Sequence, residues 1–390
     1  MSQFQILSPE SEEQPTSAHQ YHERFTRAFV SSLEPRVKLV DSKDGVDLFS
    51  YSNLEEGDSD AVRQCRGIVF NKGTLILKGY GHTDEYTCDE FMSDPDLVLD
   101  GCRVFEAHEG TLIRMFFTNN HWFQSTHRRL DAYRSKWAGD ESFGHTFASA
   151  MNADNGPPTY TDLLDKERQY MFLLCNTPAN RIVCNAPEKP TVYHVGTFHQ
   201  GKLLLDDDIG IDRPREYIDL SKEDAVSVVN EISPERLQGL IVIREEDAST
   251  FKIISKSYKE YAELRGNEPS VRFRYLQIRM DMPSRAKFMD LYPEWISAFD
   301  EYEDILYEVV LNLKDAYIRR YIKKEFITVP NEEFGVIKEI HKWHVEDRVN
   351  NHVNADIVRD ALNRQPPSKL NKIIRKYLLL RREAENEAYE

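Results

Sequence analysis

Hydrophobic positions follow two periods along the chain, and the change between them predicts its architecture. Up to about residue 260, short apolar or alternating runs recur between turn residues, which is typical of strands. From about residue 284 the apolar residues recur at helical spacing, as in Ile305, Val309, Leu313 and Tyr317. We therefore predict an α+β fold, with a disordered segment at 1–18, a sheet domain over 19–283 and an all-helical domain over 284–390.

The same pattern assigns individual elements. In the sheet domain we expect a helix over 19–33 and strands at 37–40, 46–51, 112–117, 122–124, 171–174, 191–197, 202–205 and 237–244. Further helices are expected at 221–232, 331–346, 353–363 and 367–384. Asn119 and Asn120 tolerate left-handed backbone conformations, so they predict a tight hairpin between the strands at 112–117 and 122–124.

Polar residues gather at the two ends of this hairpin. Gly110, at the start of its first strand, would let a ligand approach the backbone closely. The side chains nearest to such a ligand would be those of Glu109, Thr111, Ser125, Thr126, His127 and Arg128. An ordinary polar hairpin is the alternative, and this stretch alone does not decide between the two.

Five segments, in one order, resemble the RNA ligase and nucleotidyltransferase superfamily, and are closest to the first type of phage RNA ligase. They are Cys65–Phe70, the hairpin, Thr177–Val183, Leu237–Val242 and Phe251–Ser255. The resemblance implies the nucleotide-binding sheet fold of that superfamily. A helical domain after the sheet domain also matches the arrangement of the phage relatives, where it serves substrate recognition.

The departures from the superfamily's pattern concern its reactive groups. The lysine that forms a covalent lysyl-nucleotide aligns with Ala107, and alanine has no lone pair to attack phosphorus. The ribose-binding glutamate aligns with Leu174 and the metal-holding glutamate with Gln238. Of the two closing lysines, Lys252 is kept and the second aligns with Ile254. The resemblance thus implies a pseudoenzyme that keeps a nucleotide site, so we expect no catalytic residue, no cofactor and no metal.

Three alternatives to a natural loss of the nucleophile stay open. An engineered removal of the lysine would explain Ala107 but not the replacements at the remaining positions. His108 could be a substitute nucleophile, although the neighbour of Ala107 in a strand should face the opposite side. A shifted alignment around Leu174 is also open, although Asn180 and Arg181 anchor the match.

Charge limits the size of the ligand. The chain has 66 acidic and 50 basic residues, for a net charge of −16, and residues 285–390 hold 20 acidic and 18 basic of them. The excess therefore lies on the sheet domain and its N-terminal extension. A strongly acidic body opposes the two RNA strands and the triphosphate of a ligase except in a local basic groove, so a short ligand is favoured. Five scattered cysteines predict reduced thiols, and no apolar run reaches the roughly 20 residues of a membrane span.

We therefore expect the chain to bind a nucleotide or an RNA 5′ end. A methylated mRNA cap is the specific candidate, because a positively charged purine prefers an aromatic sandwich and a carboxylate. The residues assigned to the ligand site are Arg66, Glu109, Gly110, Thr111, Thr126, His127, Arg128, Arg181, Tyr193, Gln238 and Lys252; Glu106, Trp122, Phe123 and Phe198 are added for a cap. The alternatives are an active RNA ligase or nucleotidyltransferase with rearranged catalytic residues, and a protein-interaction scaffold with a vestigial pocket.

The C-terminal part adds two motifs and a possible partner surface. The arginines of 272–279, interleaved with Phe273 and Tyr275, could bind RNA, but a packed element with ion-paired arginines is favoured. His341 and His344 are interpreted as packing and capping residues rather than metal ligands. The helices could bind a protein partner. The whole sequence, including RGNEPSVRFRYLQ, also resembles ligase-like proteins of large DNA viruses, which implies the cytoplasm of an infected cell or a virion.

Overall fold

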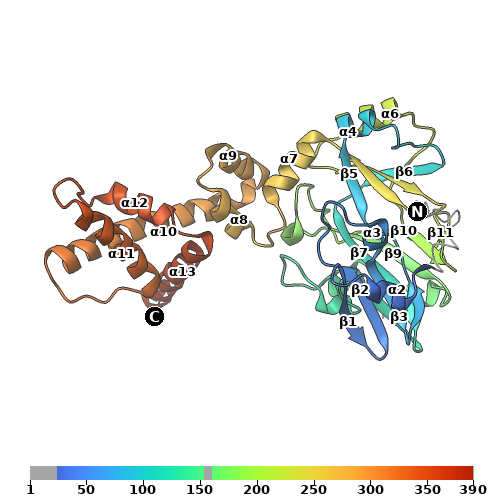
Figure 1. Cartoon of the computed structure of the whole chain (residues 1–390), viewed down its shortest axis with the longest axis horizontal. Helices are drawn as coiled ribbons and strands as arrows, with labels where there is room; N and C mark the ends of the chain where they lie inside the picture. Colours follow the sequence, from blue (N-terminus) through green and yellow to red (C-terminus); the bar gives the residue numbers. More distant parts are fainter. Residues whose placement is uncertain (1–23, 153–159, 390) are drawn as a thin grey trace, which may run out of the picture. The chain divides into compact units, whose positions relative to one another are not determined.

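The computed structural model describes residues 24–152 and 160–389, and the chain divides into two compact units that meet between Glu260 and Tyr261. The first unit is built on strands and the second on helices, which confirms the predicted α+β class (Figure 1). The division lies before the expected residue 284 because helices already follow one another from Lys256 onward. The segment predicted to be disordered, 1–18, and most of the turn expected at 152–160 lie outside the described residues.

Three sheets form the first unit. The N-terminal sheet, of order β1-β2-β3-β4, contains β1 (Val37–Lys43), β2 (Val46–Tyr51), β3 (Arg66–Asn71) and β4 (Thr74–Leu77). The hairpin sheet, of order β11-β10-β9-β7-β8, contains β7 (Gly110–Thr118), β8 (His121–Ser125), β9 (Gln169–Cys175), β10 (Val192–His199) and β11 (Lys202–Leu204). The mixed sheet, of order β12-β6-β13-β14-β5, contains β5 (Thr83–Thr87), β6 (Cys102–Ala107), β12 (Glu216–Tyr217), β13 (Gly239–Arg244) and β14 (Thr250–Ile254), with β14 parallel to β5.

The turns of the hairpin sheet follow from its residues. Asn119 and Asn120 have φ of 51° and 62°, so the expected left-handed turn joins β7 to β8. Gln200 and Gly201 have φ of 49° and 77° and join β10 to β11 in the same way. The hairpin predicted at Asn119 and Asn120 is therefore confirmed, and the strands expected at 191–197 and 202–205 form a second one.

The sheets of the first unit share one core. Leu48 of the N-terminal sheet, Phe105 of the mixed sheet and Met171 of the hairpin sheet belong to the same buried cluster. On the other face of the mixed sheet, α4 and α6 pack Phe91 and Val229 against its strands (Figure 1). The helices and turns of this unit are α2 (Arg27–Ser32), α3 (Asp60–Gln64), α4 (Cys88–Ser93), η1 (Ala132–Arg134), α5 (Phe143–Met151), η2 (Tyr160–Leu163), η3 (Pro178–Asn180) and α6 (Lys222–Glu231).

The second unit is helical and begins within α7 (Lys256–Arg265), the helix that leads out of the first unit. It continues with α8 (Val271–Ile278), α9 (Met282–Leu291), η4 (Pro293–Trp295), α10 (Ile296–Tyr317), the π-helical turn η5 (Ile318–Ile322), α11 (Asn331–Glu346), α12 (Ala355–Asn363) and α13 (Pro367–Tyr389). In α8, Tyr275 stacks on Phe299 at 4.3 Å and Arg279 pairs with Glu303 at 2.6 Å. The favoured interpretation of 272–279 as a packed element is confirmed.

Candidate functional site

The positions that align with the lost lysines form one row across the mixed sheet. Gly239 of β13 pairs with Ala107 of β6 on one side and with Ile254 of β14 on the other. The next row on the same face contains Phe105, Ile241 and Lys252. Lys252 Nζ is the amine of these two rows, and it pairs with the Glu85 carboxylate at 2.8 Å. The row in which the superfamily's nucleophile would lie is therefore apolar.

The carboxylate of Glu109 is buried and accepts hydrogen bonds from the protein itself. Its Oε1 accepts from the backbone N–H of Val183 at 2.8 Å and from the Tyr258 hydroxyl at 3.0 Å. Its Oε2 accepts from the backbone N–H of Ile182 and the side-chain amide of Asn176, both at 3.3 Å. Because these donors satisfy the carboxylate, Glu109 joins β7 to the segment before β10 and to α7.

Gln238 and Arg181 flank this network. Gln238 Nε2 donates to Tyr258 Oη at 2.9 Å, while its Oε1 is buried without a hydrogen-bond partner among the described residues. The guanidinium of Arg181 lies 3.3 Å from the carbonyl oxygen of Val183. Both side chains therefore lie beside Glu109.

Gly110 and Thr111 serve the contact between β7 and β9. A Cβ on Gly110 would lie 2.4 Å from the Leu174 carbonyl oxygen, so the glycine permits close strand pairing rather than ligand approach. Thr111 and Leu174, together with residues of α5 and η3, line a narrow recess that has no room for a water molecule. This recess lies on the face of the hairpin sheet that α5 covers.

His108 is engaged by its neighbours. Its ring stacks on Tyr193 with centroids 4.7 Å apart, and its Nε2 lies 3.4 Å from Glu106 Oε2. The pKa of His108 is lowered, because burial lowers it more than the nearby Glu106 carboxylate raises it. Of the other aromatic residues considered for a cap, Phe123 and Phe198 are buried in the shared core.

A second group of predicted residues lies in a concentration of positive charge, which we call the arginine cluster. It consists of Arg63, Arg66, His82, Arg114, His127 and Arg128. Three of these, Arg66, His127 and Arg128, were predicted from the sequence. Of the others, Arg63 lies at the end of α3, His82 precedes β5 and Arg114 lies in the middle of β7.

Arg114 assembles the cluster from within. Its side chain is buried, and it donates one hydrogen bond to the carbonyl oxygen of Gly67 and another, at 2.6 Å, to that of Thr126. Gly67 has φ of +84°, and a Cβ there would lie 2.8 Å from the His127 Cα. Thr126 Oγ1 in turn accepts from the backbone N–H of Arg128 at 3.3 Å. Arg114 therefore holds the end of the hairpin against β3, which brings His127 and Arg128 to Arg66.

Arg63 of the cluster pairs with Asp84, but Arg66 and Arg128 have no counter-ion among the described residues. Arg66 donates to the carbonyl oxygen of Gly81 at 3.5 Å and Arg128 to that of Ser52, and in the described part of the chain neither pairs with a carboxylate. Burial, followed by the charges of Arg66, Arg114 and Arg128, lowers the pKa of His127 to about 3. Half-buried cations that repel one another and meet only carbonyl oxygens form a site suited to an anion.

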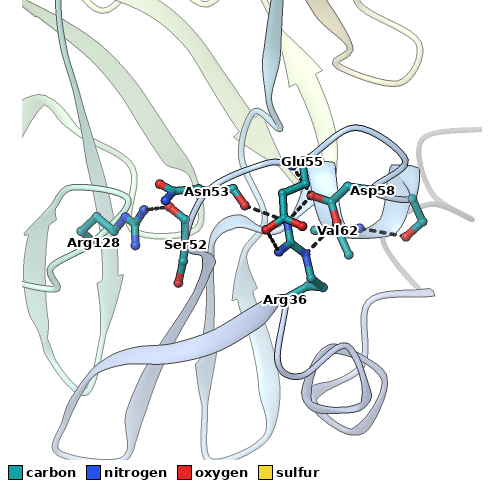
Figure 2. A network of polar contacts seen from close by, with 8 residues as sticks. Arg36, Ser52, Asn53, Glu55, Asp58, Val62 and Arg128 are labelled. Carbon is teal, nitrogen blue, oxygen red and sulfur yellow. Dashed lines mark hydrogen bonds and ion pairs between the residues drawn. The ribbon is translucent and has the colours of Figure 1, made fainter. Parts of the chain in front are cut away.

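The segment beside the cluster is fastened on both sides, as Figure 2 shows. Arg128 holds Ser52 through its carbonyl oxygen, and Arg36 donates to the carbonyl oxygen of Asn53 at 2.9 Å. Arg36 also pairs with Glu55 at 2.6 Å and Asp58 at 2.5 Å. This segment follows Tyr51, the last residue of β2, whose hydroxyl lies 3.2 Å from His82 Nδ1.

Several of these residues could not be found by sequence motif. Tyr51, His82 and Asp84 come from two separate segments, and Arg114 occupies a strand position that usually takes an apolar residue. Two short patterns were available: Arg63 and Arg66 are three residues apart, and His82 and Asp84 are two apart. Neither pattern indicates which other segment of the chain its residues contact.

One of the resemblances seen in the sequence is found again among known proteins. No protein-family model matches the chain. It is 28% identical over 347 residues to the immediate-early protein ICP-46 homolog of Invertebrate iridescent virus 6, covering 80% of this chain and 76% of that one. It is 26% identical over 346 residues to the homolog of Invertebrate iridescent virus 3, covering 83% and 75%. These relatives confirm the predicted resemblance to proteins of large DNA viruses.

Among solved structures, the chain matches a putative ATP-dependent DNA ligase from Aquifex aeolicus with a TM-score of 0.40 and 10% identity, over 69% of this chain and 71% of that chain. It matches an archaeal ATP-dependent RNA ligase with a TM-score of 0.38 and 12% identity, over 68% and 69%.

Proposed function

We propose that the chain binds a nucleotide or the 5′ end of an RNA through its phosphates, at the arginine cluster. The observation that carries the proposal is that Arg66 and Arg128 are half-buried and meet only carbonyl oxygens. A phosphate accepts several charge-assisted hydrogen bonds at once, and arginine presents the planar fork that matches it. Binding would therefore supply the negative charge that this site lacks.

The same proposal holds that binding proceeds without a lysyl-nucleotide. The row Ala107, Gly239 and Ile254 offers no amine, and Lys252 is paired with Glu85. Ala107 cannot act as a nucleophile, because the methyl side chain of alanine has no lone pair. A pseudoenzyme at this position is therefore favoured over a ligase that uses its usual lysine.

A capped 5′ end is the narrower form of the proposal. Tyr193 and Glu106 are the remaining candidates for an aromatic and carboxylate site, but both contact His108 and Glu106 is buried. Glu109 is satisfied by protein donors, and Phe123 and Phe198 belong to the core. An uncapped phosphate end is favoured over a cap for this reason.

Binding of short RNAs that differ only at the 5′ end tests the proposal. Fluorescence polarisation with a 5′-triphosphate, a 5′-monophosphate, a capped end and a 5′-hydroxyl should give affinities that fall in the order of phosphate charge. Arg66→Ala and Arg128→Ala should each weaken binding of the triphosphate about tenfold or more, because each removes charge-assisted hydrogen bonds. Arg129→Ala is the matched control, since the exposed Arg129 adjoins the cluster in sequence. Equal binding of all four ends, or a cap preference that survives both substitutions, would contradict the proposal.

The second unit supports a further candidate, a protein partner. Phe326 is 97% exposed and Val349 78% exposed, and a protein partner that covers this part of the unit would bury them. If a protein partner binds this unit, amide hydrogen exchange at residues 323–330 should be slower in the complex than in the free protein. We propose that the protein acts in the cytoplasm of an infected cell or in a virion. No helix in the described part of the chain is long and apolar enough to cross a membrane.

A further inference from the structure

Tyr51 belongs to a chain of three polar side chains beside the arginine cluster. Its hydroxyl lies 3.2 Å from His82 Nδ1, and His82 Nε2 lies 3.6 Å from Asp84 Oδ1. Asp84 is also bound by Arg63, so its carboxylate is held in place. A hydroxyl, an imidazole that can take its proton and a carboxylate that orients the imidazole are the parts of an activated nucleophile.

The backbone around these residues is fixed. The Tyr51 N–H donates to the Cys65 carbonyl oxygen at 3.0 Å, and the His82 N–H donates to that of Arg63 at 2.9 Å. The segment that follows Tyr51 is fastened by Arg128 and Arg36, as described above (Figure 2). Tyr51 and His82 are therefore positioned by backbone and arginine contacts rather than by their mutual hydrogen bond alone.

The pKa shifts define the protonation states before a phosphate binds. Burial raises the pKa of Tyr51, so the phenol is protonated, while the charges of Arg66, Arg128 and Arg63 act in the opposite direction and favour the phenolate. Burial lowers the pKa of His82, so the imidazole is neutral and can accept the hydrogen bond of the phenol. It is also a weaker base, so proton transfer is inferred from the geometry. The same arginines that would bind a phosphate thus act on the phenol oxygen.

We propose that Tyr51 attacks a phosphorus atom of a phosphoanhydride held by the arginine cluster, with His82 as the general base and Asp84 as the residue that orients it. The Tyr51 Oη–P bond forms while the bond from that phosphorus to the leaving phosphate breaks. The phenol proton passes to His82 Nδ1 and then to the leaving phosphate. The product is a phosphotyrosyl ester, and no oxidant, reductant or lysine takes part.

This inference rests on the proposed phosphate binding but goes beyond it, because binding alone needs no nucleophile. Attack on the α-phosphorus of a nucleoside triphosphate would leave a nucleotidyl group on Tyr51 and release pyrophosphate. Attack on the γ-phosphorus would leave a phosphoryl group and release the diphosphate. In both reactions the same bond forms at Tyr51 Oη, and a radioactive label at the α- or the γ-phosphorus distinguishes them.

The test is to incubate the full-length protein with Mg²⁺ and ATP or GTP labelled at the α- or the γ-phosphorus. We expect a protein-bound label that survives both acid and alkali, as a tyrosyl phosphate ester does, and that peptide mass spectrometry locates on Tyr51. A lysyl phosphoramidate is lost in acid, so the two adducts are distinguishable. Tyr51→Phe should abolish the label, and His82→Gln should slow its appearance about 100-fold or more.

Tyr133→Phe is the matched control, because Tyr133 also lies against a histidine, His145, at 4.9 Å but is 44% exposed. It should label as the unmodified protein does. If nucleotides bind in an Arg66-dependent manner and no label appears, the inference is wrong and the proposed function stands; if nucleotides do not bind, both fail. A label on any residue other than Tyr51 also overturns the inference, and an unchanged free energy of unfolding for Tyr51→Phe separates loss of chemistry from loss of structure.

Discussion

The Arg114 guanidinium lies inside the protein with carbonyl oxygens as its acceptors. Burial, with the nearby charge of Arg66, lowers the pKa of Arg114 to about 9. Two backbone acceptors offset only part of the free energy needed to bury a charge. Since a simple packing role would be filled better by an apolar residue, this cation is best explained by its position, which joins the end of the hairpin to β3.

Acid stability should report on His127. The pKa of this group is about 3 in the folded chain against an ordinary value of 6.5, so the unfolded chain takes up a proton first as the pH falls. Stability is therefore complete above pH 6.5 and is lost as the pH falls from there towards 3, at about 1.4 kcal/mol for each pH unit at most. His127→Gln should flatten this dependence in urea unfolding between about pH 7.5 and about pH 4.5.

His121→Gln is the control, since His121 is exposed on the turn between β7 and β8. A saturating polyphosphate should also reduce the acid sensitivity of the unmodified protein, because an anion beside His127 favours its protonated form. The assignment is wrong if His127→Gln and the unmodified protein lose stability along the same curve.

At the level of single residues, the sequence indicated which side chains have suitable chemistry but not which other side chains they contact. Arg66, His127 and Arg128 could be predicted because they lie in motif-bearing segments. Tyr51 and His82 could not, because they are 31 residues apart and meet only once β2 and β5 are in place. Glu109 was found, but the Tyr258 hydroxyl that it binds lies 149 residues away, so its engagement with protein donors could not be foreseen.

Among the elements, those with strong local signals were predicted well. The helix expected at 331–346 is α11 (Asn331–Glu346), and the one expected at 221–232 is α6, capped by Ser221 with Asp224 in a capping box. The helix α5 begins at Phe143 because Ser142 caps it, with its side chain accepting a hydrogen bond from the His145 N–H. The parallel pairing of β5 with β14 has no local signal, since it joins segments 167 residues apart.

The Glu109 network should stabilise the segment between β9 and β10. Glu109→Gln places an amide N–H₂ either at the Oε1 position, which accepts from Val183 and Tyr258, or at the Oε2 position, which accepts from Ile182 and Asn176. In both orientations buried donors lose their acceptor. We expect a loss of roughly 2–3 kcal/mol in the free energy of unfolding. Urea unfolding measures it, and amide exchange at Ile182 and Val183 should quicken more than elsewhere.

Glu188→Gln is the control for the charge change, because Glu188 is an exposed carboxylate in the same segment. If both substitutions have the same small effect, Glu109 is not the acceptor that holds the segment. Its carboxylate would then be available for a ligand, as the sequence suggested.

For the whole molecule, net charge and local charge have opposite signs. A chain of net charge −16 repels extended polyanions, while the arginine cluster attracts the few phosphates that can reach it. Binding of an RNA 5′ end should therefore involve its terminal phosphates and little of the strand that follows. This separates an end-binding protein from one that holds a length of RNA.

The dependence of affinity on salt and on RNA length measures this difference. A single strand that engages about three phosphates should give a slope of about −2 in log K against log salt, and RNAs of about 4 and about 20 nucleotides with the same 5′-triphosphate should bind alike. Arg128→Ala should reduce the slope by about 0.7, because one phosphate contact fewer releases fewer counter-ions. Arg129→Ala should leave it unchanged. A slope that steepens as the RNA lengthens would mean that a second basic surface holds the strand, and the 5′ end would then not be the feature that the chain recognises.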